Sequence, residues 1–149
     1  MSAASQQNNM RRLHGLLGRD LGYIWGERES GPNGEKRIFL NIGKVFLRAL
    51  AQDLGLRDAV VRSNPAGIGV SGDCTLYGMW EESGVYVCVC RFPGSRENVI
   101  LYRAIRNIRD YRGGYNNYIR LRDLETLTYG ELLARIGSVR RDRACERAA

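Results

Sequence analysis

The sequence predicts an α+β protein in which a mainly antiparallel sheet packs against N-terminal, central and C-terminal helices. Three observations support this prediction. Apolar residues recur at helical spacing in three separate segments, they alternate with a period of two between residues 73 and 108, and turn residues separate the alternating runs. A length of 149 residues with 44% hydrophobic residues suits one folded domain, which we expect over 10–140 between flexible ends at 1–9 and 141–149.

The first half of the chain contains two helical patterns. Leucines recur every three or four residues from Met10 to Leu21, which predicts an N-terminal helix. From Gly43 to Leu54 apolar residues follow one side of a helix and polar residues the other, and Gly55 is suited to end it. Between these two helices, turn residues at Pro32–Gly34 lie between apolar flanks, so residues 22–40 are compatible with an additional hairpin.

The middle of the chain reads as strands. Residues 57–62 include a short β-branched run that predicts a strand. Three alternating runs follow at 74–80, 85–92 and 98–105. Because turn residues separate these runs, they predict a three-stranded antiparallel meander over about 73–108. The middle run is apolar on both faces, so we expect its strand to be central and covered on both sides.

The last predicted element is a C-terminal helix. Thr128 and Glu131 have the spacing of a capping box, in which each side chain bonds to a free backbone N–H group of the other residue. An apolar stripe follows these two residues at helical spacing.

The charge of the chain is strongly positive. The formal net charge is +7, and only Lys36 and Lys44 of the 23 basic residues are lysines. Arginine presents a planar fork that suits phosphate and carboxylate, so nucleic acid or an acidic protein is the expected partner. No segment has the composition of a membrane span, and the N-terminus lacks the order of a secretory signal. We therefore expect no membrane association and a cytoplasmic location.

Segment 102–122 has the most informative pattern in the chain. Arginines recur every third residue, and tyrosines are interleaved with them around a Gly113–Gly114 pair. Guanidinium groups pair with phosphates and aromatic faces stack on unpaired bases, while glycines allow close backbone approach to a ligand. The residues expected to contact nucleic acid or another partner are Arg103, Arg106, Arg109, Tyr111, Arg112, Tyr115 and Asn116, with Lys44 and Arg48 extending the patch.

Two geometries are open for this segment. A helix from Arg103 to Arg112 would place the arginines in one stripe, whereas a strand ending near Ile108 would divide them between two faces. The β-branched residues that precede the segment favour the strand. In both geometries residues 110–117 form a loop. A solvated basic surface without any partner would have the same composition, so this role also stays open.

The four cysteines and the one histidine do not form a recognisable catalytic or metal motif. Cys88 and Cys90 are spaced for one face of a strand, which lacks the turn that directs two sulfurs at one zinc ion. Burial in the core is the favoured role, and zinc binding with Cys74 and with Cys145 or His14 is the alternative. We expect no cofactor and no enzymatic activity.

The stretches SGDCTLYGMW and VILYRAIRNIRDYRGGYNNYIRL, which span residues 71–121, resemble uncharacterised accessory proteins of bacterial integrative and conjugative elements and phages. Those proteins have an SG-x-x-TL-x-G-x-W strand, then LYR, then a DY-x-GG-x-N turn. The chain departs from the pattern at Asn117–Tyr118, where a tryptophan is expected beside the asparagine. The resemblance implies a small cargo protein of a mobile element that binds DNA or blocks a host defence complex, and it supplies no catalytic residue.

Two functional hypotheses follow. The first is a non-enzymatic nucleic-acid-binding accessory protein whose affinity falls steeply with salt. The second is an anti-defence inhibitor, similar in action to an anti-CRISPR protein, which docks the same arginines and tyrosines on an acidic or nucleic-acid-binding host protein. A metal-dependent enzyme is a third alternative and would require bound zinc.

Overall fold

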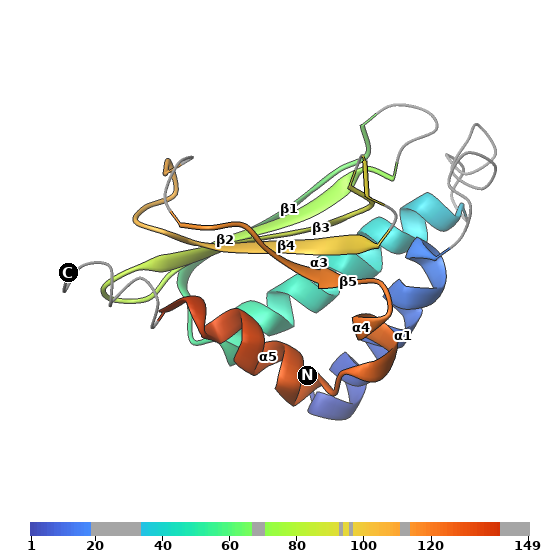
Figure 1. Cartoon of the computed structure of the whole chain (residues 1–149), viewed down its shortest axis with the longest axis horizontal. Helices are drawn as coiled ribbons and strands as arrows, with labels where there is room; N and C mark the ends of the chain where they lie inside the picture. Colours follow the sequence, from blue (N-terminus) through green and yellow to red (C-terminus); the bar gives the residue numbers. More distant parts are fainter. Residues whose placement is uncertain (19–33, 67–70, 93, 96, 111–113, 141–149) are drawn as a thin grey trace.

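The computed structural model describes residues 1–18, 34–66, 71–92, 94–95, 97–110 and 114–140. Its elements, labelled as in Figure 1, are α1 (Ala3–Leu17), α3 (Glu35–Asp53), β1 (Arg57–Asn64), β2 (Asp73–Met79), β3 (Gly84–Cys90), β4 (Asn98–Ile105), β5 (Asn117–Arg120), α4 (Asp123–Thr126) and α5 (Tyr129–Gly137). The strands form one sheet in the order β1-β2-β3-β4-β5, and each neighbouring pair is antiparallel. The predicted α+β class is confirmed, and the predicted meander gains one strand at each edge.

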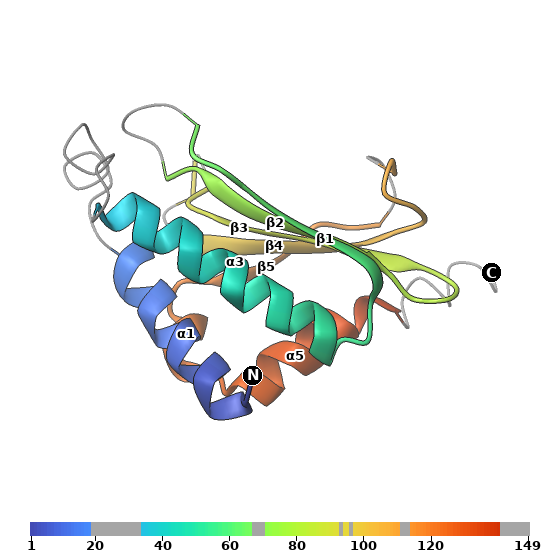
Figure 2. The same ribbon diagram turned by 180° about the vertical axis from the view of Figure 1, so that it is seen from behind.

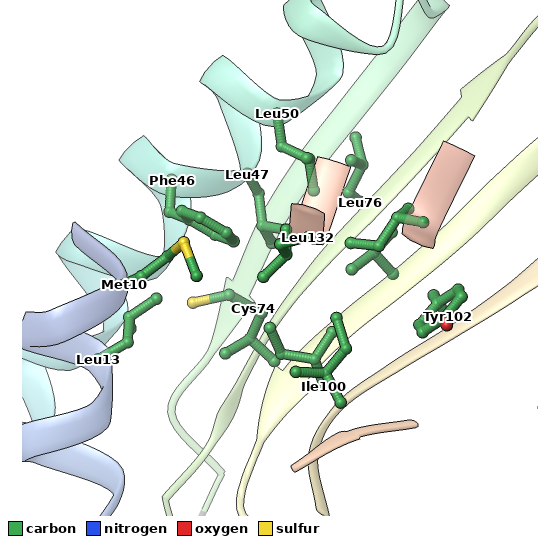
Figure 3. Close-up of a cluster of buried hydrophobic side chains, with 14 of the residues drawn as sticks. Met10, Leu13, Phe46, Leu47, Leu50, Cys74, Leu76, Ile100, Tyr102 and Leu132 are labelled. Carbon is green, nitrogen blue, oxygen red and sulfur yellow. The ribbon is translucent and has the colours of Figure 1, made fainter. Parts of the chain in front are cut away.

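The strand register sorts side chains between the two faces of the sheet. Val87 pairs with Leu76 on one side and Tyr102 on the other, and all three side chains are buried in the hydrophobic core. The described helices lie on this face, as the two opposite views in Figures 1 and 2 show. We call it the helix face and the opposite face the open face. The close-up in Figure 3 shows side chains of α1, α3 and α5 meeting those of β2 and β4.

β3 is central, as the sequence predicts, and six of its seven residues are buried. The burial has a different cause on each face. Helices cover its valines, whereas no described helix lies over the open face, where Cys88 and Cys90 are only 6% and 9% exposed. Neighbouring side chains such as Tyr86 and Tyr77 therefore contribute the cover there.

The predicted hairpin over 22–40 is wrong for the part that the structure describes. Residues 35–40 form the first turns of α3, which extends the predicted helix 43–54 toward its N-terminus, and residues 19–33 lie outside the described residues. Phe39, Ile42 and Phe46 are buried at helical spacing, so the apolar stripe begins before Gly43. The turn residues before Glu35 thus precede a helix, with Gly34 as its N-cap.

α1 begins much earlier than the sequence predicts. Residues 3–9, expected to be part of a flexible end, are helical, and Ser2 caps the helix by accepting the N–H of Ser5 at 3.1 Å. Gln6 is fully buried and donates from Nε2 to the carbonyl oxygen of Phe46 at 3.0 Å. Gln6 therefore connects this segment to the backbone of α3, a tertiary role that composition does not reveal. The helix ends at Leu17, and Leu21 lies outside the described residues.

The capping box of the C-terminal helix α5 is confirmed. Thr128 Oγ1 accepts the N–H of Glu131 at 3.1 Å, and the Glu131 carboxylate accepts the N–H of Thr128 at 3.1 Å. Leu132 and Ile136 then reach the core. Residues 141–149 lie outside the described residues. Across the described ranges, no helix combines the length and hydropathy needed to cross a bilayer.

Candidate nucleic-acid interface

The turn that follows β4 is organised by Asp110. The Asp110 side chain is only 3% exposed, and its carboxylate accepts the backbone N–H of Arg106 at 2.9 Å and the Nε of the same residue at 3.3 Å. Its carbonyl oxygen accepts Nη2 of Arg103 at 3.3 Å. Asn107 closes the turn, because its carbonyl accepts the N–H of Asp110 at 3.0 Å and its Oδ1 accepts the N–H of Arg109 at 2.9 Å. One buried acid therefore positions two of the predicted arginines.

The predicted strand geometry of this segment is confirmed, since β4 continues to Ile105 and places Arg103 on the sheet. The predicted helix over 103–112 is not formed in the described residues, which turn at 106–109. Arg106 keeps a 62% exposed side chain despite its ion pair, and Arg109 is exposed as well. Tyr111 and Arg112 lie outside the described residues.

Gly114 serves the fold directly. It has a φ of +77°, and a Cβ at this position would lie 2.5 Å from the carbonyl oxygen of Ala104. The close backbone approach that we expected toward a ligand is made here to the neighbouring strand β4. Asn117 then fixes the entry to β5 by donating from Nδ2 to the carbonyl oxygens of Tyr102 at 3.3 Å and Tyr115 at 3.0 Å.

The two residues between these anchors face solvent. Tyr115 is 83% exposed, the largest exposure among the described large hydrophobic residues, and Asn116 is also exposed. A tyrosine ring held in water by an anchored backbone is available for stacking against a planar ligand. Arg106, Arg109 and Tyr115 thus belong to the segment between β4 and β5. We call these three residues, together with Arg103, the arginine turn.

The open face carries a row of planar side chains beside this turn. Tyr77 of β2 pairs with Tyr86 of β3, and Tyr86 pairs with Arg103 of β4, so the three side chains share one face. The two tyrosine rings have centroids 4.7 Å apart and an interplanar angle of 32°. The Arg103 guanidinium carbon lies 5.3 Å from the Tyr86 ring centroid, a cation–π contact. Arg103 is therefore fixed from two sides, by Tyr86 and by Asp110.

A second row crosses the open face next to the first. It joins residues of all five strands by direct pairing, namely Arg62, Thr75, Cys88, Leu101 and Tyr118. Tyr118 is 39% exposed and contacts Phe92 edge to face, with ring centroids 5.8 Å apart and an interplanar angle of 82°. Arg62 is exposed at the opposite end of the row. Each row has a tyrosine at one end and an arginine at the other, and the two rows run in opposite directions across the sheet.

Lys44 and Arg48 do not join this surface. Both belong to α3, which packs on the helix face, so the sheet separates them from the row that contains Arg103. Lys44 is partly buried and acts electrostatically on Cys74, whereas Arg48 lines a hollow against Leu56 and Val61 at the β1 edge. The predicted patch thus divides between two sides of the molecule.

The cysteines are core residues, as the sequence favours. Cys74, Cys88 and Cys90 are free and buried. Burial raises the pKa of the Cys74 thiol to about 12. On the open face, a hydrogen bond from Cys90 lowers the pKa of the Cys88 thiol and raises the pKa of Cys90 itself. Within the described ranges, no three His, Cys, Asp or Glu side chains are grouped to hold a metal ion, and Cys145 lies outside those ranges.

Sequence reasoning missed the aromatic members of the open face, Tyr77, Tyr86 and Tyr118. Alternation predicts which face of its strand each of Tyr77 and Tyr86 occupies. Only the register between β2 and β3 shows that the two rings are neighbours. Tyr118 belongs to β5, a strand that the sequence does not predict, and Asn117, expected in the loop 110–117, is its first residue. Comparisons with known proteins gave no match to a protein-family model, to a curated protein or to a solved structure.

Proposed function

We propose that this protein binds nucleic acid without a catalytic step, through the arginine turn. The observation that carries the proposal is the buried Asp110, which fixes Arg103 and Arg106 and leaves Arg109 and Tyr115 exposed beside them. A chain with a net charge of +7 and a fixed group of guanidinium forks is suited to phosphate oxygens. The resemblance to mobile-element accessory proteins supports the same proposal.

Preorganisation is the physical argument for binding over mere solvation. Arginine side chains lose rotamer freedom when they bind, and this loss opposes association. Arg103 already has its position fixed by Tyr86 and by the carbonyl of Asp110, so part of this loss is incurred on folding. A surface that only needs solubility gains nothing from fixing its cations.

The proposal is tested by fluorescence anisotropy of labelled RNA and DNA over a series of salt concentrations. We expect the affinity to fall steeply with salt, and the double variant Arg106→Gln/Arg109→Gln to lower it for all sequences alike. The slope against salt should decrease by about 1 for each arginine that contacts phosphate. The double variant Arg12→Gln/Arg48→Gln is the matched control, because it removes the same two charges from exposed positions on α1 and α3. An equal loss in the control, or no binding at low salt, would contradict the proposal.

The alternative function is an anti-defence inhibitor that docks on a host protein complex. The exposure of Tyr115 favours it, because tyrosine and arginine are typical anchors of protein interfaces. Tight binding to one host protein that depends weakly on salt, together with no affinity for nucleic acid, would support this alternative. Substituting Tyr115 by alanine should then weaken the complex, while Tyr115→Phe should largely preserve it.

A further inference from the structure

The open face is flat sheet surface with aromatic residues in it. No described helix lies over this face in either view of the molecule. Its planar row consists of Tyr77, Tyr86 and Arg103, and Tyr118 stands in the adjoining row next to Leu101. Tyr118 and Tyr115 leave 39% and 83% of their surfaces in water. Rings exposed in this way are available for stacking against a planar ligand.

The charges around this face are mainly positive. Arg62 is exposed at the β1 side, and Arg120 has a 50% exposed side chain on β5, where its guanidinium lies 3.7 Å from Glu97. The arginine turn adds Arg106 and Arg109 at the end of β4. Asp73 of β2 lies on the same face, paired with Cys90, and burial raises the pKa of its carboxyl group. A ligand at the β5 side of the face therefore meets the exposed rings of Tyr118 and Tyr115 close to several cations.

We propose that the ligand is an unpaired nucleic-acid strand, whose bases stack on the exposed rings at the β5 side of the open face, Tyr118 and Tyr115, while its phosphates contact the arginines of the turn. This inference rests on the proposed function and names its substrate class. In a duplex the bases are already stacked on one another, so a flat aromatic face gains little from it, whereas an unpaired base has a free π-face. Four spacings between strands at about 4.8 Å give the face a width of roughly 19 Å. Open antiparallel sheets that bind RNA stack about two or three bases across such a surface.

Arg103 links the two parts of this site. Its guanidinium lies over the Tyr86 ring and donates a hydrogen bond to the carbonyl oxygen of Asp110. A strand that stacks on the open face therefore continues directly to the phosphate-binding arginines. Tyr118 is the sharpest position for a test, because it is partly exposed at the sheet edge and its ring contacts Phe92 only edge to face.

The test compares three probes of the same mixed sequence by fluorescence anisotropy: single-stranded RNA, single-stranded DNA and the duplex DNA. We expect at least one single strand to bind roughly tenfold or more tightly than the duplex. Tyr118→Ala should lower the single-strand affinity by roughly tenfold and leave duplex binding unchanged, while Tyr118→Phe should keep wild-type affinity. Val45→Ala, at a residue 39% exposed on α3, is the matched control, and thermal melts confirm that each variant is folded.

The possible outcomes separate the two proposals. Preference for a single strand that depends on the Tyr118 ring supports the inference, and the RNA and DNA arms show which sugar is selected. Equal or tighter binding of the duplex, or an affinity that Tyr118→Ala does not change, overturns the inference while the proposed function stands. Failure of all three probes to bind at low salt overturns both.

Discussion

Replacing Asp110 tests whether one buried carboxylate holds the arginine turn together. In Asp110→Ala the backbone N–H of Arg106 loses a charged acceptor at 2.9 Å, and such a hydrogen bond contributes about 1.5–3 kcal/mol. The contact to the Arg106 Nε adds at most about 1 kcal/mol, because that side chain is 62% exposed and screened by water. We therefore expect the free energy of unfolding to decrease by about 2–3 kcal/mol.

The expected change is large enough to measure by thermal unfolding. A loss of 1 kcal/mol shifts Tm by about 2–4 °C in a protein of this size, so Asp110→Ala should melt about 4–12 °C lower than the wild type. Asp110→Asn keeps an oxygen that accepts the Arg106 N–H but loses the charge, and we expect it to lie between the two.

Glu97→Ala is the matched control for Asp110→Ala. It breaks an ion pair between side chains that are 67% and 50% exposed, which should change stability by less than about 1 kcal/mol. If Asp110→Ala melts within the same range as Glu97→Ala, Asp110 does not hold the turn and the argument from preorganisation fails.

Three further predictions concern the helices and the buried thiol. Gly43→Ala should destabilise the folded protein, because the new Cβ would lie 2.6 Å from Cys74 Sγ. We expect this overpacking to cost about 1–3 kcal/mol, while the higher helix propensity of alanine returns about 1 kcal/mol. The loss in free energy of unfolding caused by Gly43→Ala should be smaller in a Cys74→Ala background. If a double-mutant cycle measured by urea denaturation gives no coupling energy between the two substitutions, the predicted clash does not occur. Gln6→Ala should cost about 1–3 kcal/mol, because it removes a buried hydrogen bond to the Phe46 carbonyl and takes the Gln6 Oε1 acceptor from the buried Asn9 amide, whereas Asn8→Ala at an exposed position should be nearly neutral in the same denaturation assay. Cys74 has a pKa of about 12 in the folded state and 9.0 as its ordinary value, so its contribution to stability is complete below pH 9 and is lost as pH rises toward 12. At pH 10 the loss relative to neutral pH is roughly 1 kcal/mol, and Cys74→Ala should show a correspondingly flatter pH profile.

The sequence by itself determined the fold class and much of the sheet. Alternation of apolar residues identifies β2, β3 and β4, and the turn residues between them require antiparallel neighbours, because short connections cannot join parallel strands. The capping box at Thr128 is equally local, since both partners lie within four residues of each other. These features are predictable because their physical causes act over a few residues of chain.

The tertiary structure decided what the polar and aromatic residues do. Gln6 is an ordinary polar residue until Phe46 of α3, which lies 40 residues further along the chain, presents its carbonyl. The candidate site depends on the same kind of information. Which arginines share a surface follows from the register that places Arg103 beside Tyr86 and from the sheet that separates Arg48 from both. Contacts between residues distant in the chain depend on how whole elements pack, and no local pattern in the sequence encodes that packing.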